Sequence, residues 1–381
     1  MLYLDNAATS FPKAPGVAEA VLHFLTQVGA SAGRSGHRLA READALLWET
    51  RALVGTLLGV KDPARVVFSL NVTQALNMAL MGLLREGDHV VTTGVEHNSV
   101  MRPLRHLEQS RGIKVTVTPC FGDGLLDPSE LLSQLVPSTR MIVMTHASNV
   151  GGGIMPIEEV AKGKGNALLL VDAAQTAGAL PIDMERMGID ILAFTGHKAL
   201  LGPPGVGGLC IGPGVVVPPL VFGGTGTSSE SHDHPSDYPL ALEAGTHNMA
   251  GVAGLRASLL YILARGVENI REDEEERTGH LFKGLQDIEG IRLYGPNDPA
   301  ARMPVISLNL DGLHPDHLVT LLDQAYGILA RSGLHCAPSA HRVFGTFPEG
   351  SVRLSPGPFQ TLDDMELVLR ALREISIQMS R

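Results

Sequence analysis

The chain has 381 residues, a formal net charge of −10 and a pI near 5.8. Hydrophobic residues make up 44% and charged residues 18%, which indicates an ordered globular protein with a sizeable core. The acidic balance and the lack of a Lys/Arg-rich run argue against nucleic acid as a partner. No signal-peptide pattern or apolar stretch of ~18 residues is present, so we expect a cytoplasmic protein without a membrane partner.

Short apolar runs alternate with helical patterns from residue 65 onward. Strands are predicted at 65–69, 89–94, 114–119, 141–148, 167–175 and 189–196. The segments between them have helical spacing and end in glycine or basic residues. This alternation predicts an α/β fold with a mostly parallel, doubly wound sheet. Ligands of such sheets bind at the carboxyl ends of the strands.

The pattern changes after residue 212. Residues 213–248 are rich in Gly, Pro and Ser and are interpreted as a long functional loop, within which 223–239 would be a lid or a docking surface. The strands and helices predicted beyond residue 249 indicate a smaller α+β domain. The predicted division is a large domain at 14–250 and a small domain at 251–381, joined by the N-terminal segment 1–13.

Two residues at predicted strand ends indicate cofactor chemistry. Lys198 follows an apolar strand and precedes a glycine-rich turn; it is either a surface cation or a Schiff-base lysine. Asp172 ends the apolar run "LLLVD", so its carboxylate needs a positive partner. Alone it could bind a ribose or magnesium, but together with Lys198 it favours the protonated ring of pyridoxal phosphate.

Two further turns contain candidate ligand-binding side chains. Asn71, Val72 and Thr73 lie between a strand and a helix, where backbone N–H groups can hold a phosphate, although Asn or Thr there is also an ordinary N-cap. The absence of GKS/GKT and GxGxxG motifs counts against ATP or NAD. His97, also at a strand end, is either a ring-stacking or proton-transferring residue or a structural histidine.

Seven motifs occur in an order that resembles a known family. They are "YLDNAATS", "EHNSV", "SNVGGGIMPI", "VDAAQTAG", "TGHKALLGPPGVGGL", "EAGTHN" and "RSGLHCA". The set resembles the class V group of fold type I pyridoxal phosphate enzymes, specifically the cysteine desulfurases and selenocysteine lyases. The similarity spans nearly the whole chain, and it implies pyridoxal 5'-phosphate as cofactor and a homodimer with shared active sites.

The resemblance also implies roles for individual residues. The implied cofactor-binding residues are Thr73, Val72, His97, Asn149, Asp172, Gln175, Thr195, His197, Lys198 and Thr246. Lys198 would bind the cofactor covalently and then transfer protons, His97 would stack on the ring, and Thr246 would reach the phosphate of the other subunit. The implied substrate-binding residues are Arg353 and Asn149; Arg353 would bind the substrate carboxylate, a task suited to a guanidinium group.

Cys336 is the most informative of the three cysteines. The resemblance implies that it is catalytic and carries a persulfide. A zinc site is the less favoured alternative because too few ligands lie nearby, so no metal is expected; a structural free cysteine is the other alternative. A positive charge on Arg331, His335 or His341 would favour a thiolate. Leu334 departs from the family pattern, in which a second histidine usually occurs.

The predicted function is therefore a cysteine desulfurase that converts L-cysteine to L-alanine and passes sulfur to an acceptor; the expected partner is a sulfur-acceptor protein. The alternatives are a selenocysteine lyase or another C–S lyase of the same fold, and a class V aminotransferase. The sequence does not identify the sulfur acceptor or decide between cysteine and selenocysteine.

Overall fold

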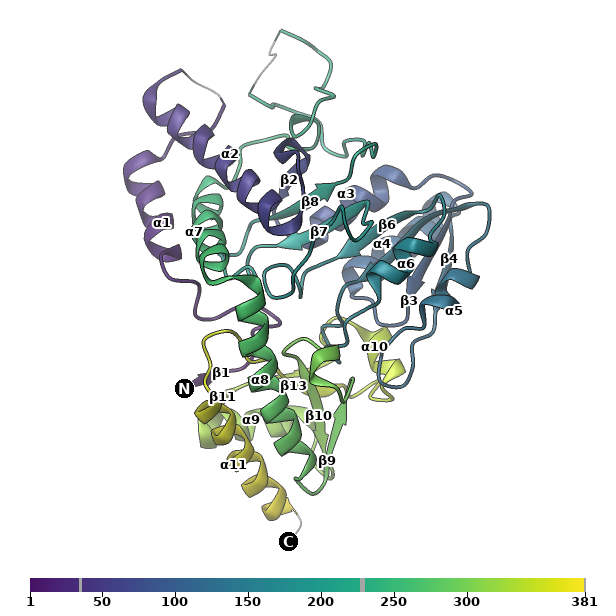
Figure 1. Cartoon of the computed structure of the whole chain (residues 1–381), viewed down its shortest axis with the longest axis vertical. Coiled ribbons are helices and arrows are strands. Elements are labelled where there is room, and N and C mark those ends of the chain that lie inside the picture. Colours follow the sequence, from purple (N-terminus) through teal and green to yellow (C-terminus); the bar gives the residue numbers. More distant parts are fainter. Residues whose placement is uncertain (34–35, 227–229, 380–381) are drawn as a thin grey trace.

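A seven-stranded mixed sheet forms the centre of the larger part of the molecule (Figure 1). The structure is a computed structural model that describes residues 1–33, 36–226 and 230–379. The strand order is β2-β8-β7-β6-β5-β3-β4, and only β8 runs antiparallel to its neighbours. The strands are β2 (Val66–Ser69), β3 (His89–Thr93), β4 (Lys114–Thr118), β5 (Thr139–Thr145), β6 (Leu168–Asp172), β7 (Ile191–Thr195) and β8 (Gly207–Ile211). The predicted α/β class and mostly parallel sheet are confirmed.

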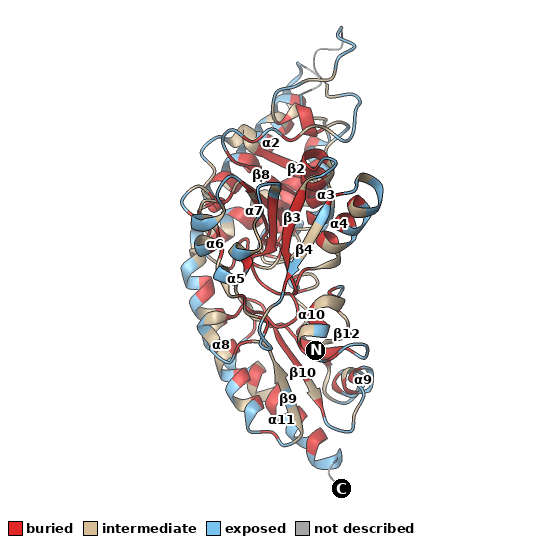
Figure 2. Ribbon diagram, turned by 90° about the vertical axis from the view of Figure 1, so that its right-hand side faces the viewer, coloured by how far each residue is buried: buried red, intermediate tan, exposed pale blue. Residues whose placement is uncertain are grey.

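Helices cover both faces of this sheet because successive strand residues point to opposite sides. Val66 and Val91 belong to one apolar core, with side chains of α2 (Arg38–Leu58) and α7 (Met249–Arg265). Val67 and Val90 belong to the other core, with α3 (Val72–Leu83) and α4 (Asn98–Arg111). Figure 2 shows buried residues concentrated in the strands. The remaining helices of this part are α1 (Val17–His23), α5 (Pro128–Ser133) and α6 (Ile157–Gly163).

A second, antiparallel sheet forms the smaller part of the molecule. Its order is β12-β13-β10-β9, and its apolar core includes side chains of the surrounding helices. The elements are α8 (Val267–Gln286), β9 (Ile291–Tyr294), β10 (Ile306–Leu310), α9 (Pro315–Tyr326), β12 (Arg331–Gly333), α10 (Pro338–Val343), β13 (Ser351–Leu354) and α11 (Leu362–Met379). The predicted α+β part is confirmed. β1 (Leu2–Tyr3) pairs with β11 (Ile328–Leu329), which attaches the N-terminal segment to it.

The chain bends by 81° between α7 and α8. Apolar residues of α7 belong to the core of the large sheet, whereas Leu281, Phe282 and Leu285 of α8 belong to that of the small sheet. The predicted boundary between residues 250 and 251 stays a prediction. Within the described ranges, no single helix is long and apolar enough to cross a membrane; α7 and α8 meet that criterion only together, as a bent pair.

The structure differs from the sequence predictions in the length of one strand and in one additional helix. The strand expected at 167–175 ends at Asp172, because the chain turns there and the amide of Ala174 donates to Asp172 Oδ1 at 2.9 Å. The 21-residue helix α2 was not predicted. The functional loop expected at 223–239 includes residues 227–229, which lie outside the described residues.

Candidate active site

A cavity of about 300 Å³ lies at the carboxyl ends of the central strands, where residues of the small sheet also line it. It brings together most of the predicted site residues. Those that line it are Val72, Thr73, His97, Asn149, Asp172, Gln175, His197, Lys198, Cys336 and Arg353. Because parallel strands end at the same edge of a sheet, residues distant in sequence meet here.

Lys198 extends into this cavity from the turn that follows β7. Removal from water lowers the pKa of its amine to about 8; the nearby Asp172 opposes this effect, and the charges of Arg353 and Arg331 add to it. A lysine must lose its proton before it can attack a carbonyl. The environment of Lys198 therefore makes the neutral amine available near neutral pH.

Asp172 lies at the end of β6 and is 3% exposed. Burial raises the pKa of its carboxyl group, while the charge of Lys198 acts in the opposite direction. The amide of Ala174 donates a hydrogen bond to Asp172 Oδ1 at 2.9 Å. A buried carboxylate in this state fits a protonated nitrogen of a bound ring.

The first turn of α3 faces the same cavity through Val72 and Thr73. Asn71 caps this helix, since its Oδ1 accepts a hydrogen bond from Gln74 N at 3.0 Å. The unpaired N–H groups of such a turn attract an anion. The hydroxyl of Thr73 contacts that of Ser99 at 2.7 Å. Ser99 also lines the cavity, and the sequence reasoning missed it although it is part of the motif "EHNSV".

His97 is the N-cap of α4, and its Nδ1 accepts a hydrogen bond from Ser99 N at 3.0 Å. Burial and the charges of Lys198 and Arg353 lower the pKa of its ring to about 4. The ring is therefore neutral at physiological pH, and a neutral ring is suited to stacking on a flat ligand. Its predicted role stays a prediction.

The side-chain amides of Asn149 and Gln175 are bonded to backbone carbonyls. Asn149 Nδ2 donates to the carbonyl of His335 at 2.8 Å, and Gln175 Nε2 donates to that of Ala7 at 3.1 Å. Asn149 thus connects the segment after β5 to the residue preceding Cys336. The oxygen atoms of the two amides are available to hold a donor on a ligand.

Arg353, on β13, contributes a buried guanidinium group. It forms an ion pair with Asp5 at 2.7 Å, donates to the carbonyl of Asn149 at 3.0 Å, and leaves a buried Nε without a partner within the described ranges. Arg331 is its register partner on β12 and also lines the cavity. Sequence reasoning did not predict Arg331 as a binding residue. Two guanidinium groups on paired strands make this end of the cavity suitable for a substrate carboxylate.

Cys336 lies between β12 and α10 and is exposed. Both His335 and Cys336 have positive φ angles, 48° and 58°, a conformation that is uncommon outside glycine. The carbonyl of Cys336 accepts a hydrogen bond from Asn98 N at 2.8 Å. This bond attaches the Cys336 turn to the start of α4, next to His97. These contacts direct a thiol-bearing turn to the edge of the Lys198 cavity.

The two histidines near Cys336 do not supply the positive charge that the sequence suggested. Burial, with the charge of Arg353, lowers the pKa of His341 to about 4, and the same causes also lower the pKa of His335. His335 Nε2 donates to the carbonyl of Ser351 at 3.1 Å. Since both rings are neutral, Arg331 is the residue of that group that remains charged.

Thr195 and Thr246 lie apart from the lining of this cavity. Thr195 is buried in β7, and its hydroxyl has no hydrogen-bond partner among the described residues. Thr246 lines another cavity, of about 240 Å³, together with Leu70 and Val221, two exposed apolar residues. The predicted cofactor contacts of both threonines and the homodimer stay predictions.

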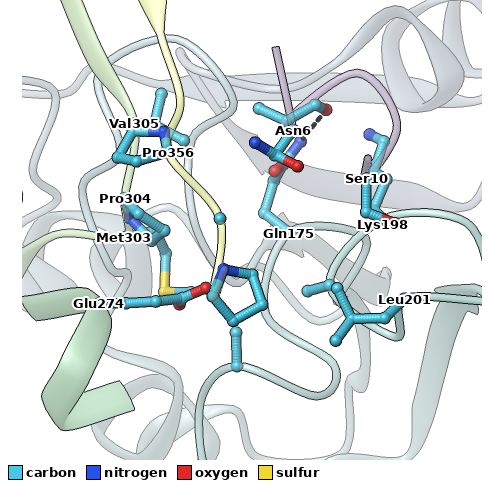
Figure 3. A pocket seen from close by; sticks show the side chains of 15 residues that line it. Asn6, Ser10, Gln175, Lys198, Leu201, Glu274, Met303, Pro304, Val305 and Pro356 are labelled. Carbon is cyan, nitrogen blue, oxygen red and sulfur yellow. Dashed lines mark hydrogen bonds between the residues drawn. The ribbon is translucent and has the colours of Figure 1, made fainter. Parts of the chain in front are cut away.

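A small cavity of about 40 Å³ borders Lys198 and Gln175. Figure 3 shows Glu274 of α8 reaching it beside Met303. Burial raises the pKa of the Glu274 carboxyl to about 7, and its Oε2 has no partner in the described part of the chain. Because Lys198 and Gln175 belong to the large part and Glu274 and Met303 to the small part, this cavity lies where the two parts meet.

Solved structures share this fold over nearly the whole chain. A cysteine desulfurase from Thermococcus onnurineus, solved in its apo form, matches with a TM-score of 0.93 and 31% identity, covering 99% of this chain and 95% of that one. A cysteine desulfurase from Escherichia coli matches with a TM-score of 0.88 and 27% identity, covering 99% and 94%. The fold is thus the cysteine desulfurase fold.

Sequence comparisons lead to the same family. The model described as "Aminotransferase class-V" matches residues 2–368. A protein of Methanothermobacter thermautotrophicus named "Probable cysteine desulfurase" is 33% identical over 98% of this chain and 94% of its own length; one of Aeropyrum pernix with the same name is 34% identical over 98% and 94%. The chain belongs to the aminotransferase class-V family, which uses pyridoxal phosphate.

Proposed function

We propose that this protein is a pyridoxal phosphate-dependent cysteine desulfurase that converts L-cysteine to L-alanine and holds the sulfur on Cys336. The observation that carries this proposal is the position of Cys336 on the same cavity as Lys198 and Asp172. The names of the relatives support it. Without a thiol at this place, the cavity would equally suit other reactions of the family.

The described residues fit the cofactor. Asp172 would hold the ring nitrogen, Lys198 would bind the aldehyde carbon, and the first turn of α3 would hold the phosphate. The bound cofactor supplies an electron sink for the substrate carbon atoms. The protein supplies the orientation, the proton carried by Lys198 and an environment largely shielded from water.

The sulfur transfer that we propose is balanced without an external oxidant. The thiolate Sγ of Cys336 forms a bond to the sulfur of L-cysteine, and the carbon–sulfur bond breaks. The electron pair of that bond stays with the substrate carbon, which takes up a proton. The products are L-alanine and a persulfide on Cys336, whose outer sulfur is available to an acceptor.

Mass spectrometry of the intact protein after treatment with L-cysteine tests this proposal. We expect the mass of one added sulfur, located on the peptide that contains Cys336, and one alanine per active site in a single turnover. Dithiothreitol should remove the added mass as sulfide. Continuous release of sulfide with no sulfur on Cys336 would instead support a lyase. If neither sulfide nor alanine forms, both activities are contradicted.

The two arginines of the cavity make a separate prediction about substrate binding. We expect Arg331→Gln to raise KM for L-cysteine about tenfold, because a hydrogen bond to a charged group is lost. Arg353→Gln should have a larger effect, since it also leaves Asp5 without its cation. Steady-state kinetics measures both effects. The control is Arg342→Gln. Arg342 is absent from the lining of the cavity, and its Cζ lies 3.7 Å from the centroid of the Phe347 ring. An equal rise in KM for this variant would contradict a specific role for Arg331.

A further inference from the structure

Glu96 is a buried acid in the turn between β3 and α4, directly before His97. Its side chain is 0% exposed. Its Oε1 accepts hydrogen bonds from the Thr93 hydroxyl at 2.6 Å and from Thr145 N at 3.0 Å. A single carboxyl oxygen therefore connects the end of β3 to the end of β5.

The two strand ends that Glu96 connects are parts of the candidate active site. Thr145 lines the main cavity and is the register partner of Asp172 on β6. His97, the next residue after Glu96, lines the same cavity. The contacts of Glu96 thus set the position of the turn that carries His97 relative to the strand end that carries Asp172.

The other oxygen of Glu96, Oε2, is buried and has no hydrogen-bond partner among the described residues. An ionised carboxylate is costly to bury when one of its oxygens has neither a hydrogen-bond donor nor a positive charge beside it. Two titratable groups interact electrostatically with the Glu96 carboxyl: the carboxyl of Asp172 and the thiol of Cys120, in the segment after β4. Neither can supply a positive charge, and ionised Asp172 would repel an ionised Glu96.

We propose that Glu96 is a positioning residue that stays protonated and holds the His97 turn against the strand ends of Thr145 and Asp172. The role toward the cofactor rests on the proposed function. With Glu96 neutral, the negative charge next to the predicted ring-nitrogen site is that of Asp172. Glu96 acts through these neighbours and has no contact with substrate in this assignment.

The charge state of Glu96 has a definite effect on stability. Burial, chiefly, raises the pKa of this carboxyl from 4.5 to about 8. In the unfolded chain the group ionises above pH 4.5, so unfolding releases a proton between the two values. The stability that protonated Glu96 contributes is complete below pH 4.5 and is lost as the pH rises through about 8.

Comparison of wild-type protein with Glu96→Gln, both loaded with pyridoxal phosphate, tests this assignment. Glutamine keeps the acceptor oxygen and cannot ionise. From pH 5 to pH 8, we expect the unfolding equilibrium constant of the wild type to increase relative to that of Glu96→Gln by up to about tenfold per pH unit. Denaturant unfolding at several pH values measures this ratio. A ratio independent of pH would overturn the proposal.

A spectroscopic measurement tests the positioning role separately. Below pH 7 the visible absorbance of the bound cofactor should be the same in Glu96→Gln and wild type; above pH 8 the spectra should diverge as wild-type Glu96 ionises. Spectra that differ equally at every pH would contradict the assignment. The control, Glu108→Gln, makes the same substitution on α4, where Glu108 pairs with Arg105, and should follow the wild type throughout.

Glu96→Leu removes both acceptor contacts and leaves the buried Thr145 N–H unpaired. We expect cofactor affinity to fall about tenfold, the effect of one unsatisfied buried donor, with partial loss of stability. Unchanged affinity would overturn the positioning role. If Glu96→Leu does not fold, the two Glu96→Gln measurements still decide. Neither requires sulfur transfer, so failure of the desulfurase proposal and failure of this one are distinguishable.

Discussion

Lys198→Ala is expected to abolish turnover and to remove the visible absorbance of the bound cofactor. The predicted covalent attachment and the proton transfers both depend on this amine, whose pKa is lowered to about 8 by burial. Loss of proton transfer alone costs up to about 10⁴-fold in rate, and loss of the covalent link adds to that. Absorbance spectra and alanine formation measure the two effects.

Two further variants define the reason for the loss. Lys198→Arg keeps a positive charge that cannot be removed at neutral pH, so we expect it to be as inactive as Lys198→Ala. Lys61→Ala changes an exposed lysine that pairs with Glu185 and should behave as wild type. An active Lys198→Ala variant with unchanged absorbance would contradict the assignment of Lys198.

Cys336→Ser is expected to keep the cofactor absorbance and to lose the transfer of sulfur. A hydroxyl is a far weaker nucleophile toward sulfur than a thiolate. Removal of a catalytic nucleophile costs at least about 10³-fold, so alanine formation should fall by that factor. Mass spectrometry should detect no added sulfur.

Cys120→Ser is the matched control for this experiment. Burial raises the pKa of the Cys120 thiol to about 11, which makes it a poor nucleophile. Cys120→Ser should therefore retain both the sulfur adduct on Cys336 and the rate of alanine formation. Full sulfide release by Cys336→Ser would show that the thiol is dispensable and would support the lyase alternative.

The large sheet could be predicted from the sequence because most of its strands are short, apolar and buried on both faces. The runs that become β2, β3 and β7 contain Val, Ile, Phe and Thr and are separated by helical patterns, so their type and order are readable. Helix α2 was missed, although nine of its residues are buried. The charged residues of α2 obscure its apolar stripe in the sequence, where the elements that cover this stripe are not visible.

Sequence reasoning also predicted most of the side chains that meet at the cavity, although not Thr195 and Thr246, which lie apart from its lining. Lys198 and Asp172 follow parallel strands, and the carboxyl ends of parallel strands lie at one edge. It did not predict Arg331 as a substrate-binding residue or Ser99 as a site residue. Both lie within motifs that had been recognised, but the motif does not show which of its side chains reach the cavity.

Local sequence by itself determined the class of fold, the strand ends that carry Lys198 and Asp172, and the family resemblance. These depend on periodicity and on residue order, which are properties of neighbouring residues. Only the tertiary structure decided the charge states and long-range contacts. Asp5 and Arg353 pair although they are 348 positions apart, and His335 and Glu96 are assigned as neutral because packing removes them from water.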